Sequence, residues 1–312
     1  MTSSDDRPGI AWWILGAATL VRLAVAAGTP LFEDEAYYWA WSRRLAAGYF
    51  DHPPLVAWVL RLGTGIAGDS PLGVRLGPVL CGLAAGIAML RSAGRLDGAS
   101  AARRAAWLAA LIPLFTGTFV VATPDAPLLA CAAWLLHATG RAIDTDEPRW
   151  WLAAGGLLGL SLLAKYTAVL IPAGVVLGCI GYRPLRAQLR RPGPWLAIAI
   201  ALVVALPMIR WNAAHDWVSF RFQLGHGFGR PSGSVLQREL SYVGSQFALF
   251  SPVLLLLAAR AGVRSAAYGA RPWRGMLAAV SAFVFAFFAL SALRRRPEGN
   301  WPALAYPAAA VL

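Results

Sequence analysis

Three consecutive acidic residues, Glu33, Asp34 and Glu35, begin a segment rich in aromatic side chains, and Asp51 and His52 follow shortly after them. Long apolar stretches lie on both sides of this segment. Ionisable groups held at a membrane are costly and are usually functional. A carboxylate can act as a general base on a hydroxyl within hydrogen-bond reach, so the cluster predicts chemistry on a polar headgroup. A structural alternative stays open, because acids also favour helix N-termini without any catalytic role.

The composition indicates an integral membrane protein. Hydrophobic residues make up 58% of the chain and charged residues only 14%, whereas soluble domains carry about 25% charged residues. The net charge of +13 comes from arginines scattered over short loops between apolar spans, a pattern typical of anchoring to anionic lipid and not of nucleic-acid binding. The three cysteines lie in apolar runs without CxxC spacing, which favours buried hydrophobes over disulfides or metal ligands.

Apolar segments predict an all-α, polytopic membrane bundle with extracytoplasmic loops. These segments lie near 10–27, 71–90, 105–122, 126–140, 150–164, 167–182, 195–209, 243–259 and 276–293. The runs 105–140 and 150–182 are too long for one helix in a hydrocarbon core of about 30 Å. We therefore expect each run to be a hairpin, with breaks at 123–125 and at 165–166.

The final apolar run starts at Trp301 and ends at Leu312, which is too short to span a membrane. We therefore expect 1–312 to form one transmembrane domain that is truncated at its C-terminus. A second, soluble domain is not indicated.

Arginines then orient the predicted spans. They gather in three short loops, at 91–104, 183–191 and 260–274. An even number of predicted spans separates these loops, so all three lie on the same side of the membrane. The positive-inside rule makes that side cytoplasmic. The opposite side then carries the polar sites of the chain, namely 28–70, Asp125, Lys165 and 210–241. Arg294, Arg295 and Arg296 also fall on this outer side, which leaves either a miscounted span or a phosphate-binding role for their planar forks of donors.

Several motifs resemble, in the same order, those of family C (GT-C) membrane glycosyltransferases. Asp34-Glu35 with Tyr37-Tyr38-Trp39 is similar to the Asp-Glu motif of their first outer loop. The other similar segments are Thr123-Pro124-Asp125, Lys165-Tyr166-Thr167, the run around His226, and Asn300-Trp301-Pro302. The resemblance extends to bacterial protein O-mannosyltransferase-like enzymes and to the aminoarabinose transferases that modify lipid A. A lysine of the latter is replaced here by His52.

The resemblance implies a transferase that moves a sugar, with inversion, from a polyprenyl-phosphate donor to an acceptor hydroxyl on the extracytoplasmic face. Asp34 is the implied base, Glu35 the next candidate, and Asp125 an orienting residue. The implied substrate-binding residues are Tyr37, Tyr38, His52, Arg61, Lys165, Tyr166, Arg294, Arg296 and Trp301. Arg75 is a further candidate for holding the lipid phosphate.

The implied acceptor is lipid A, another glycan, a lipid or a protein. The enzyme would therefore act in lipopolysaccharide or protein glycosylation. It would lie in the bacterial inner membrane, with its active site facing the periplasm or the cell exterior.

The implied mechanism requires no cofactor. In the aminoarabinose transferases a loop histidine and an acidic residue can share a zinc ion, and the matching positions are Asp51 and His226. Both side chains are suitable ligands for Zn²⁺, so zinc or another divalent metal is an additional hypothesis.

A transporter or lipid flippase for polyprenyl-linked glycans is the alternative function from another class. Transporters usually place broken helices at the membrane midplane and often have repeated halves. Here the acids lie at the membrane boundary and no internal repeat is visible.

Overall fold

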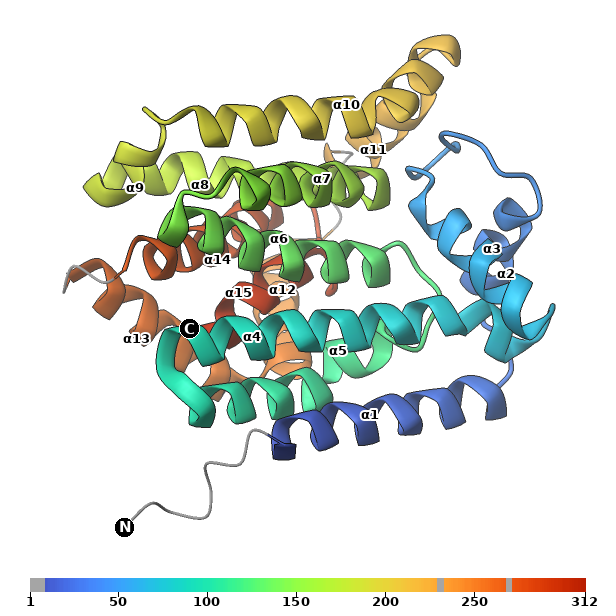
Figure 1. The fold of residues 1–312 in the computed structure, drawn as a ribbon. Coiled ribbons are helices and arrows are strands. Elements are labelled where there is room, and N and C mark those ends of the chain that lie inside the picture. The colour runs from blue at the N-terminus through green and yellow to red at the C-terminus, as the bar shows by residue number, and fades with distance from the viewer. Residues whose placement is uncertain (1–8, 229–232, 268–270) are drawn as a thin grey trace.

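The computed structural model describes residues 9–228, 233–267 and 271–312, and every regular element within these ranges is a helix. Figure 1 shows the long helices side by side, running back and forth between two ends of a bundle. The predicted all-α bundle is confirmed. The elements in chain order are α1 (Gly9–Gly28), α2 (Glu33–Ser42), α3 (Leu55–Ala67), α4 (Pro71–Leu111), α5 (Pro113–Thr118), α6 (Asp125–Thr145), α7 (Pro148–Ala164), η1 (Tyr166–Val169), α8 (Leu170–Gly181), α9 (Arg183–Gln188), α10 (Pro192–Ala214), α11 (Val218–Phe228), α12 (Val235–Phe250), α13 (Pro252–Ala267), α14 (Pro272–Ala292), η2 (Trp301–Ala305) and α15 (Tyr306–Val311).

Five of the described helices, α1, α4, α6, α10 and α14, are long and apolar enough to cross a membrane. Counting the bent pair of α12 and α13 as one span raises the number to six. That bend, 93°, corrects the prediction of one span over 243–259. It falls at Ser251, where φ is 90°, and at Pro252, which has no N–H to continue the helix.

The two longest apolar runs break where the sequence predicts. Helix α6 begins at Asp125, and α7 ends just before Lys165, whose backbone is extended. The predicted reversal at 91–104 is present but is shorter than predicted, because the two helices that form α4 meet at a kink at Asp97 and Gly98 and the arginines lie on the helices beside it (Figure 1). Gly98 has φ of 79°, a conformation that favours glycine. The predicted loop at 210–241 is also largely helical, since α10, α11 and α12 occupy most of it.

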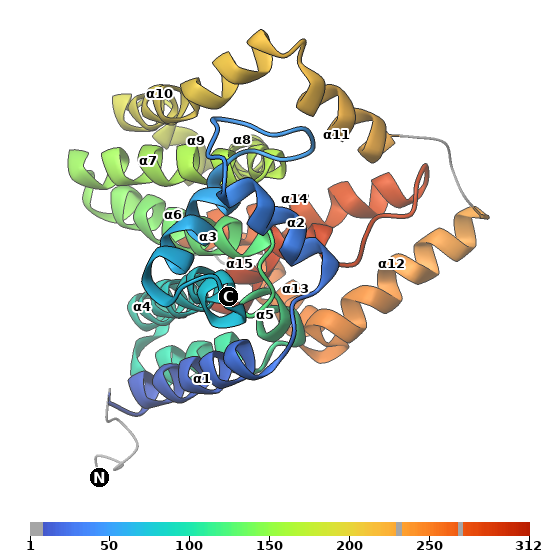
Figure 2. The ribbon, with the colours of Figure 1, turned by 90° about the vertical axis from the view of Figure 1, so that its right-hand side faces the viewer.

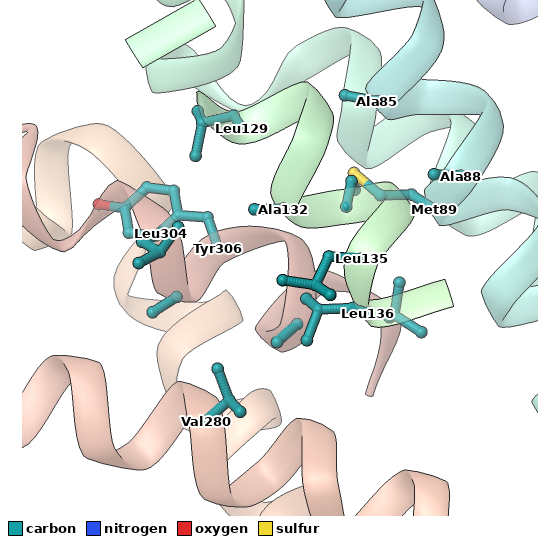
Figure 3. Close-up of a cluster of buried hydrophobic side chains, with 14 of the residues drawn as sticks. Ala85, Ala88, Met89, Leu129, Ala132, Leu135, Leu136, Val280, Leu304 and Tyr306 are labelled. Carbon is teal, nitrogen blue, oxygen red and sulfur yellow. The ribbon is translucent and has the colours of Figure 1, made fainter. Parts of the chain in front are cut away.

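Helix α6 lies at the centre of the bundle and packs against α4, α7, α14 and α15. Its side chains face Met89 of α4, Val280 of α14 and Tyr306 of α15 (Figure 3). Many of the buried residues are alanine or glycine, which let membrane helices approach closely. On α7, a Cβ atom added at Gly159 would lie 2.5 Å from the Cβ of Val204 on α10. The helices are therefore positioned by close backbone contact as much as by large side chains.

The two ends of the bundle differ in character. Helices α2, α3 and α11 lie at one end, together with the start of α6 and the end of α7, and Figure 2 looks onto this end. The break in α4, the short helix α9 and the start of α14 lie at the other end, where the arginines gather. The predicted convergence of the sequence-distant polar segments on one end of the molecule is confirmed.

Candidate active site

A buried ion pair joins the first acidic motif to the start of α4. The carboxylate of Glu35 accepts hydrogen bonds from Nε of Arg75 at 2.8 Å and from its Nη2 at 2.6 Å, and neither side chain is exposed. The same carboxylate accepts from the backbone N–H groups of Phe32 and Ala122, both at 2.9 Å. Glu35 therefore fastens the N-terminus of α2 to the loop that leads into α6.

Glu35 is held as a carboxylate in this environment. Burial on its own would raise its pKa, but hydrogen bonds from Arg75, Phe32 and Ala122, with the Arg75 charge, lower it below the usual 4.5. The sequence predicted Glu35 as a reserve catalytic base. Because its carboxylate is fully enclosed, we instead assign it a positioning role.

Arg75 has no donor left for a substrate. Besides Glu35 it donates to the carbonyl oxygens of Thr29 at 2.9 Å and Pro30 at 2.7 Å, and to the Thr29 hydroxyl at 2.6 Å. Its side chain is fully buried. The hypothesis that Arg75 binds the lipid phosphate is therefore wrong, and the residue anchors the chain between α1 and α2.

Asp34 stands next to this buried pair but is exposed, in the first turn of α2. Within the described ranges its carboxylate has no hydrogen-bond partner, so it is accessible to an incoming hydroxyl. The buried phenol of Tyr38 lies behind it. Desolvation raises the pKa of Tyr38, and the negative charges of Asp51, Asp34 and Asp125 raise it further.

The second acidic motif forms a three-residue cluster. Asp125, the first residue of α6, accepts a hydrogen bond from Nζ of Lys165 at 2.9 Å and another from Nδ2 of Asn300 at 2.9 Å. Asp125 and Lys165 are mostly buried, at 7% and 12% side-chain exposure. The ammonium group of Lys165 has two further N–H donors for an anion. Asn300 was not among the predicted site residues, although it lies in one of the motifs that resemble the family.

Tyr166 makes structural contacts within the protein. Its hydroxyl donates to Oγ of Ser219 at 2.8 Å and accepts from Nδ2 of Asn212 at 3.2 Å, and its ring lies 4.4 Å from that of Phe220. The sequence predicts Tyr166 as a substrate contact but does not indicate Asn212 or Ser219. No local pattern marks those two, because their partner lies on a different helix.

Helix α11 is attached to the loop between α2 and α3. The side chain of Gln223 donates to the backbone oxygen of Asp51, and the rings of Phe50 and Phe222 are 4.9 Å apart. Asp51 also accepts a hydrogen bond from the hydroxyl of Tyr37 at 3.2 Å. The α11 segment therefore covers one side of the cluster around Tyr38.

The predicted metal site combines Asp51 with His226. His226 falls on α11, but its side chain lies outside the described residues. Among the side chains that are described, no group of three or more His, Cys, Asp or Glu is arranged to hold a metal ion. Metal binding stays a prediction.

The remaining predicted residues are distributed around the same end. The ring of His52 is 6.1 Å from that of Tyr38. Arg294 and Arg296 are exposed just after α14, and Arg295 between them donates to the carbonyl of Gly225 on α11 at 3.1 Å. These arginines therefore do lie with the acids, as the span count predicted. Arg61 is exposed on α3, and Trp301 is half-buried at the start of η2.

Comparisons with known proteins agree with this geometry. Residues 51–211 match the family model described as dolichyl-phosphate-mannose-protein mannosyltransferase. The lipid A galacturonosyltransferase RgtD of Rhizobium johnstonii is 28% identical over 91% of this chain and 60% of its own length. The undecaprenyl phosphate-alpha-4-amino-4-deoxy-L-arabinose arabinosyl transferase of Photorhabdus laumondii is 26% identical over 73% of this chain and 39% of its own length.

A solved structure has the same fold. ArnT from Cupriavidus metallidurans in its apo state superposes with a TM-score of 0.73 at 22% identity, covering 97% of this chain and 58% of ArnT. The form bound to undecaprenyl phosphate also gives 0.73, at 21% identity and with 97% and 59% coverage. The chain therefore spans about 60% or less of the length of these similar proteins.

Proposed function

The chain belongs to the dolichyl-phosphate-mannose-protein mannosyltransferase family, which is part of the GT-C membrane glycosyltransferases. On this premise we propose that it transfers a sugar from a polyprenyl-phosphate donor to an acceptor hydroxyl. The observation that carries the proposal is the exposed Asp34 on α2, at the same end of the bundle as the mostly buried cluster of Asp125, Lys165 and Asn300 (Figure 1). In that cluster the ammonium group of Lys165 donates a hydrogen bond to the carboxylate of Asp125. An accessible carboxylate at the same end of a membrane bundle as an ion-paired lysine suits a reaction between a lipid phosphate and a hydroxyl.

Asp34 acts as the general base in this proposal. It takes the proton of the acceptor hydroxyl while the hydroxyl oxygen bonds to the anomeric carbon and the bond from that carbon to the phosphate oxygen breaks. The configuration at the anomeric carbon inverts, through a transition state with oxocarbenium character. The leaving group is a lipid phosphate, which is already acidic and needs no general acid. Cationic groups that stabilise its growing charge matter more.

Lys165, His52, Arg294 and Arg296 are the proposed phosphate-binding groups. Lys165 is already oriented by Asp125, and the arginines stand on the loop that also carries Asn300. Asp125 would therefore hold the ammonium in place or bind a sugar hydroxyl. The ion pair of Glu35 and Arg75, with the hydrogen bond from Ala122 to Glu35, ties α2 and therefore Asp34 to the loop that leads into α6.

We propose a lipid A or lipopolysaccharide-core hydroxyl as the acceptor, because two similar proteins are named for lipid A and lipopolysaccharide-core galacturonosyl transfer. Uronic and aminopentose sugars are then the first donors to compare. The proposed location is the bacterial inner membrane, with the arginine-rich end in the cytoplasm and the carboxylate cluster facing the periplasm.

The test uses the full-length protein in liposomes with lipid A and a panel of polyprenyl-phosphate sugars, following loss of each donor. Asp34→Asn should lower turnover by about 10²–10⁴-fold, the usual contribution of a general base, while donor binding persists. Glu33→Gln is the matched control, since Glu33 is an exposed acid on the same helix turn.

Three outcomes contradict parts of the proposal. Near-normal turnover by Asp34→Asn removes Asp34 from the role of base. Equal losses in Asp34→Asn and Glu33→Gln indicate a general charge effect. Movement of polyprenyl-linked glycan across the bilayer without donor cleavage replaces the transferase with a flippase.

A further inference from the structure

Gln246 of α12 is a buried amide with partners on two other segments, and the proposed mechanism does not use it. The residue is 3% exposed. Its Oε1 accepts a hydrogen bond from the hydroxyl of Tyr306 at 2.7 Å, and its Nε2 donates to the carbonyl oxygen of Gly299 at 3.1 Å. Tyr306 is itself fully buried in the core. Both ends of the amide are therefore occupied, and its orientation is fixed.

The Gly299 carbonyl belongs to the connection between α14 and η2, residues 293–300. This connection carries Asn300 and the proposed phosphate-binding arginines. The backbone of Gly299 also packs closely against α12, because a Cβ atom added there would lie 3.1 Å from the nearest side-chain atoms of that helix. Gln246 therefore holds against α12 the end of the connection that lies next to Asn300.

The other end of the connection is held by the same helix. Arg238, about two helical turns before Gln246, donates to the carbonyl oxygens of Ala292 at 2.9 Å and Leu293 at 2.6 Å. Arg238 is 5% exposed. Carbonyl groups at a helix C-terminus have no donor within the helix, so this contact also satisfies the end of α14. Helix α12 thus fixes both ends of the connection.

The position of Asn300 affects the proposed phosphate site through Asp125. Nδ2 of Asn300 donates to Oδ2 of Asp125 at 2.9 Å, while Nζ of Lys165 donates to Oδ1 at 2.9 Å. Because each carboxylate oxygen has its own donor, the carboxylate plane is fixed and the ammonium group keeps one direction for its two remaining N–H donors. Without Asn300, both oxygens would be open to Lys165, and the ammonium group would be drawn between them.

We propose that Gln246 is a positioning residue for sugar transfer. Through the backbone of residues 299–300 it places Asn300 on Asp125. That carboxylate then orients the ammonium group of Lys165 toward the phosphate of the polyprenyl donor. The inference rests on the proposed transferase function and adds to it a residue that touches no substrate.

The test measures binding of undecaprenyl phosphate to the full-length protein in detergent by isothermal titration calorimetry. This probe has no sugar, so the measurement separates the phosphate site from the chemistry at Asp34. Gln246→Met keeps the length of the side chain and removes the amide. It should weaken binding about tenfold, the order expected for the loss of one hydrogen bond to a charged group.

Tyr242→Phe is the matched control. Tyr242 lies on the same helix, is 7% exposed, and donates to the carbonyl oxygen of Phe285 on α14 at 2.8 Å. Its change removes a buried hydrogen bond to a carbonyl group but leaves residues 293–300 held. Both variants should unfold at lower denaturant concentration than the unmutated protein, whereas only Gln246→Met should bind the lipid phosphate more weakly. Equal weakening in both variants would overturn the positioning role.

A double-mutant cycle with Asn300→Ala tests the route from α12 to the phosphate site. If Gln246 acts through Asn300, the double variant should bind the lipid phosphate no more weakly than Asn300→Ala alone. Effects of independent sites add, so single losses that add in the double variant would overturn this route.

Gln246→Asn decides the question if Gln246→Met fails to fold, as judged by gel filtration. Its amide is one methylene shorter and cannot reach both Tyr306 and Gly299, so binding should again weaken. Unchanged affinity in Gln246→Asn would overturn the role of Gln246 and leave the proposed transfer intact. Failure of the unmutated protein to bind undecaprenyl phosphate would instead contradict the proposed function, and this inference with it.

Discussion

Replacing Arg75 by methionine should destabilise the protein and stop the proposed transfer, although Arg75 touches no substrate. The change leaves the Glu35 carboxylate buried without its cation, and the Thr29 and Pro30 carbonyl oxygens without donors. Breaking a buried pair by removing one partner costs about 3–5 kcal/mol. The free energy of unfolding should fall by that amount, and turnover should fall because α2 no longer holds Asp34 in place.

The double variant, Glu35→Leu with Arg75→Met, makes the prediction sharper. An apolar pair often replaces a buried ion pair at little cost, so the double variant should be more stable than Arg75→Met. It should not recover fully, because the Ala122 and Phe32 N–H groups lose their acceptor. Each unsatisfied buried group costs about 1–3 kcal/mol. Its turnover should stay low, since the tie between α2 and the loop before α6 is gone.

Denaturant unfolding in mixed micelles measures these stabilities, and donor consumption in liposomes measures turnover. Arg43→Met is the control, because Arg43 pairs with Asp69 at 3.0 Å near the same end but both side chains are over 40% exposed. Such pairs contribute about 0–1 kcal/mol. A cost for Arg75→Met no larger than for Arg43→Met would refute the reasoning. A double variant whose loss of stability equals the sum of the losses in Arg75→Met alone and in Glu35→Leu alone would refute it equally.

Four further outcomes are expected. Because the folded pKa of Glu35 lies below the usual 4.5, its contribution to stability should be complete above about pH 4.5 and lost as the pH falls through the folded value; unfolding of Glu35→Gln should lack this component. Lys165→Met should weaken donor binding and turnover together, and an effect on neither would exclude it from the site. Gly159→Leu should destabilise the protein by at least about 1–3 kcal/mol through overpacking, whereas Gly156→Leu should be tolerated because no atom lies within 4 Å of the added Cβ. If the metal hypothesis holds, elemental analysis of untagged protein should show metal that His226→Ala loses, and a content near zero in the unmutated protein would end it.

The sequence by itself determined the features that depend on local chemistry. The length of the apolar runs and the low charge content predicted a membrane bundle of helices. The breaks before Asp125 and at Lys165 followed from the limit on span length, and both occur in the structure. The even number of predicted spans between the arginine-rich loops was enough to place the acidic segments together at the opposite end. These properties need no knowledge of which helix packs against which.

Only the tertiary structure decided which polar groups pair. Glu35 with Arg75, and Asp125 with both Lys165 and Asn300, are contacts between residues far apart in sequence. Lipid-facing and buried surfaces of a membrane helix are both apolar, so hydropathy does not reveal how a helix is rotated or which neighbour it meets. For the same reason the sequence could not separate the exposed Asp34 from the enclosed Glu35, two adjacent acids whose roles differ only because one of them faces Arg75.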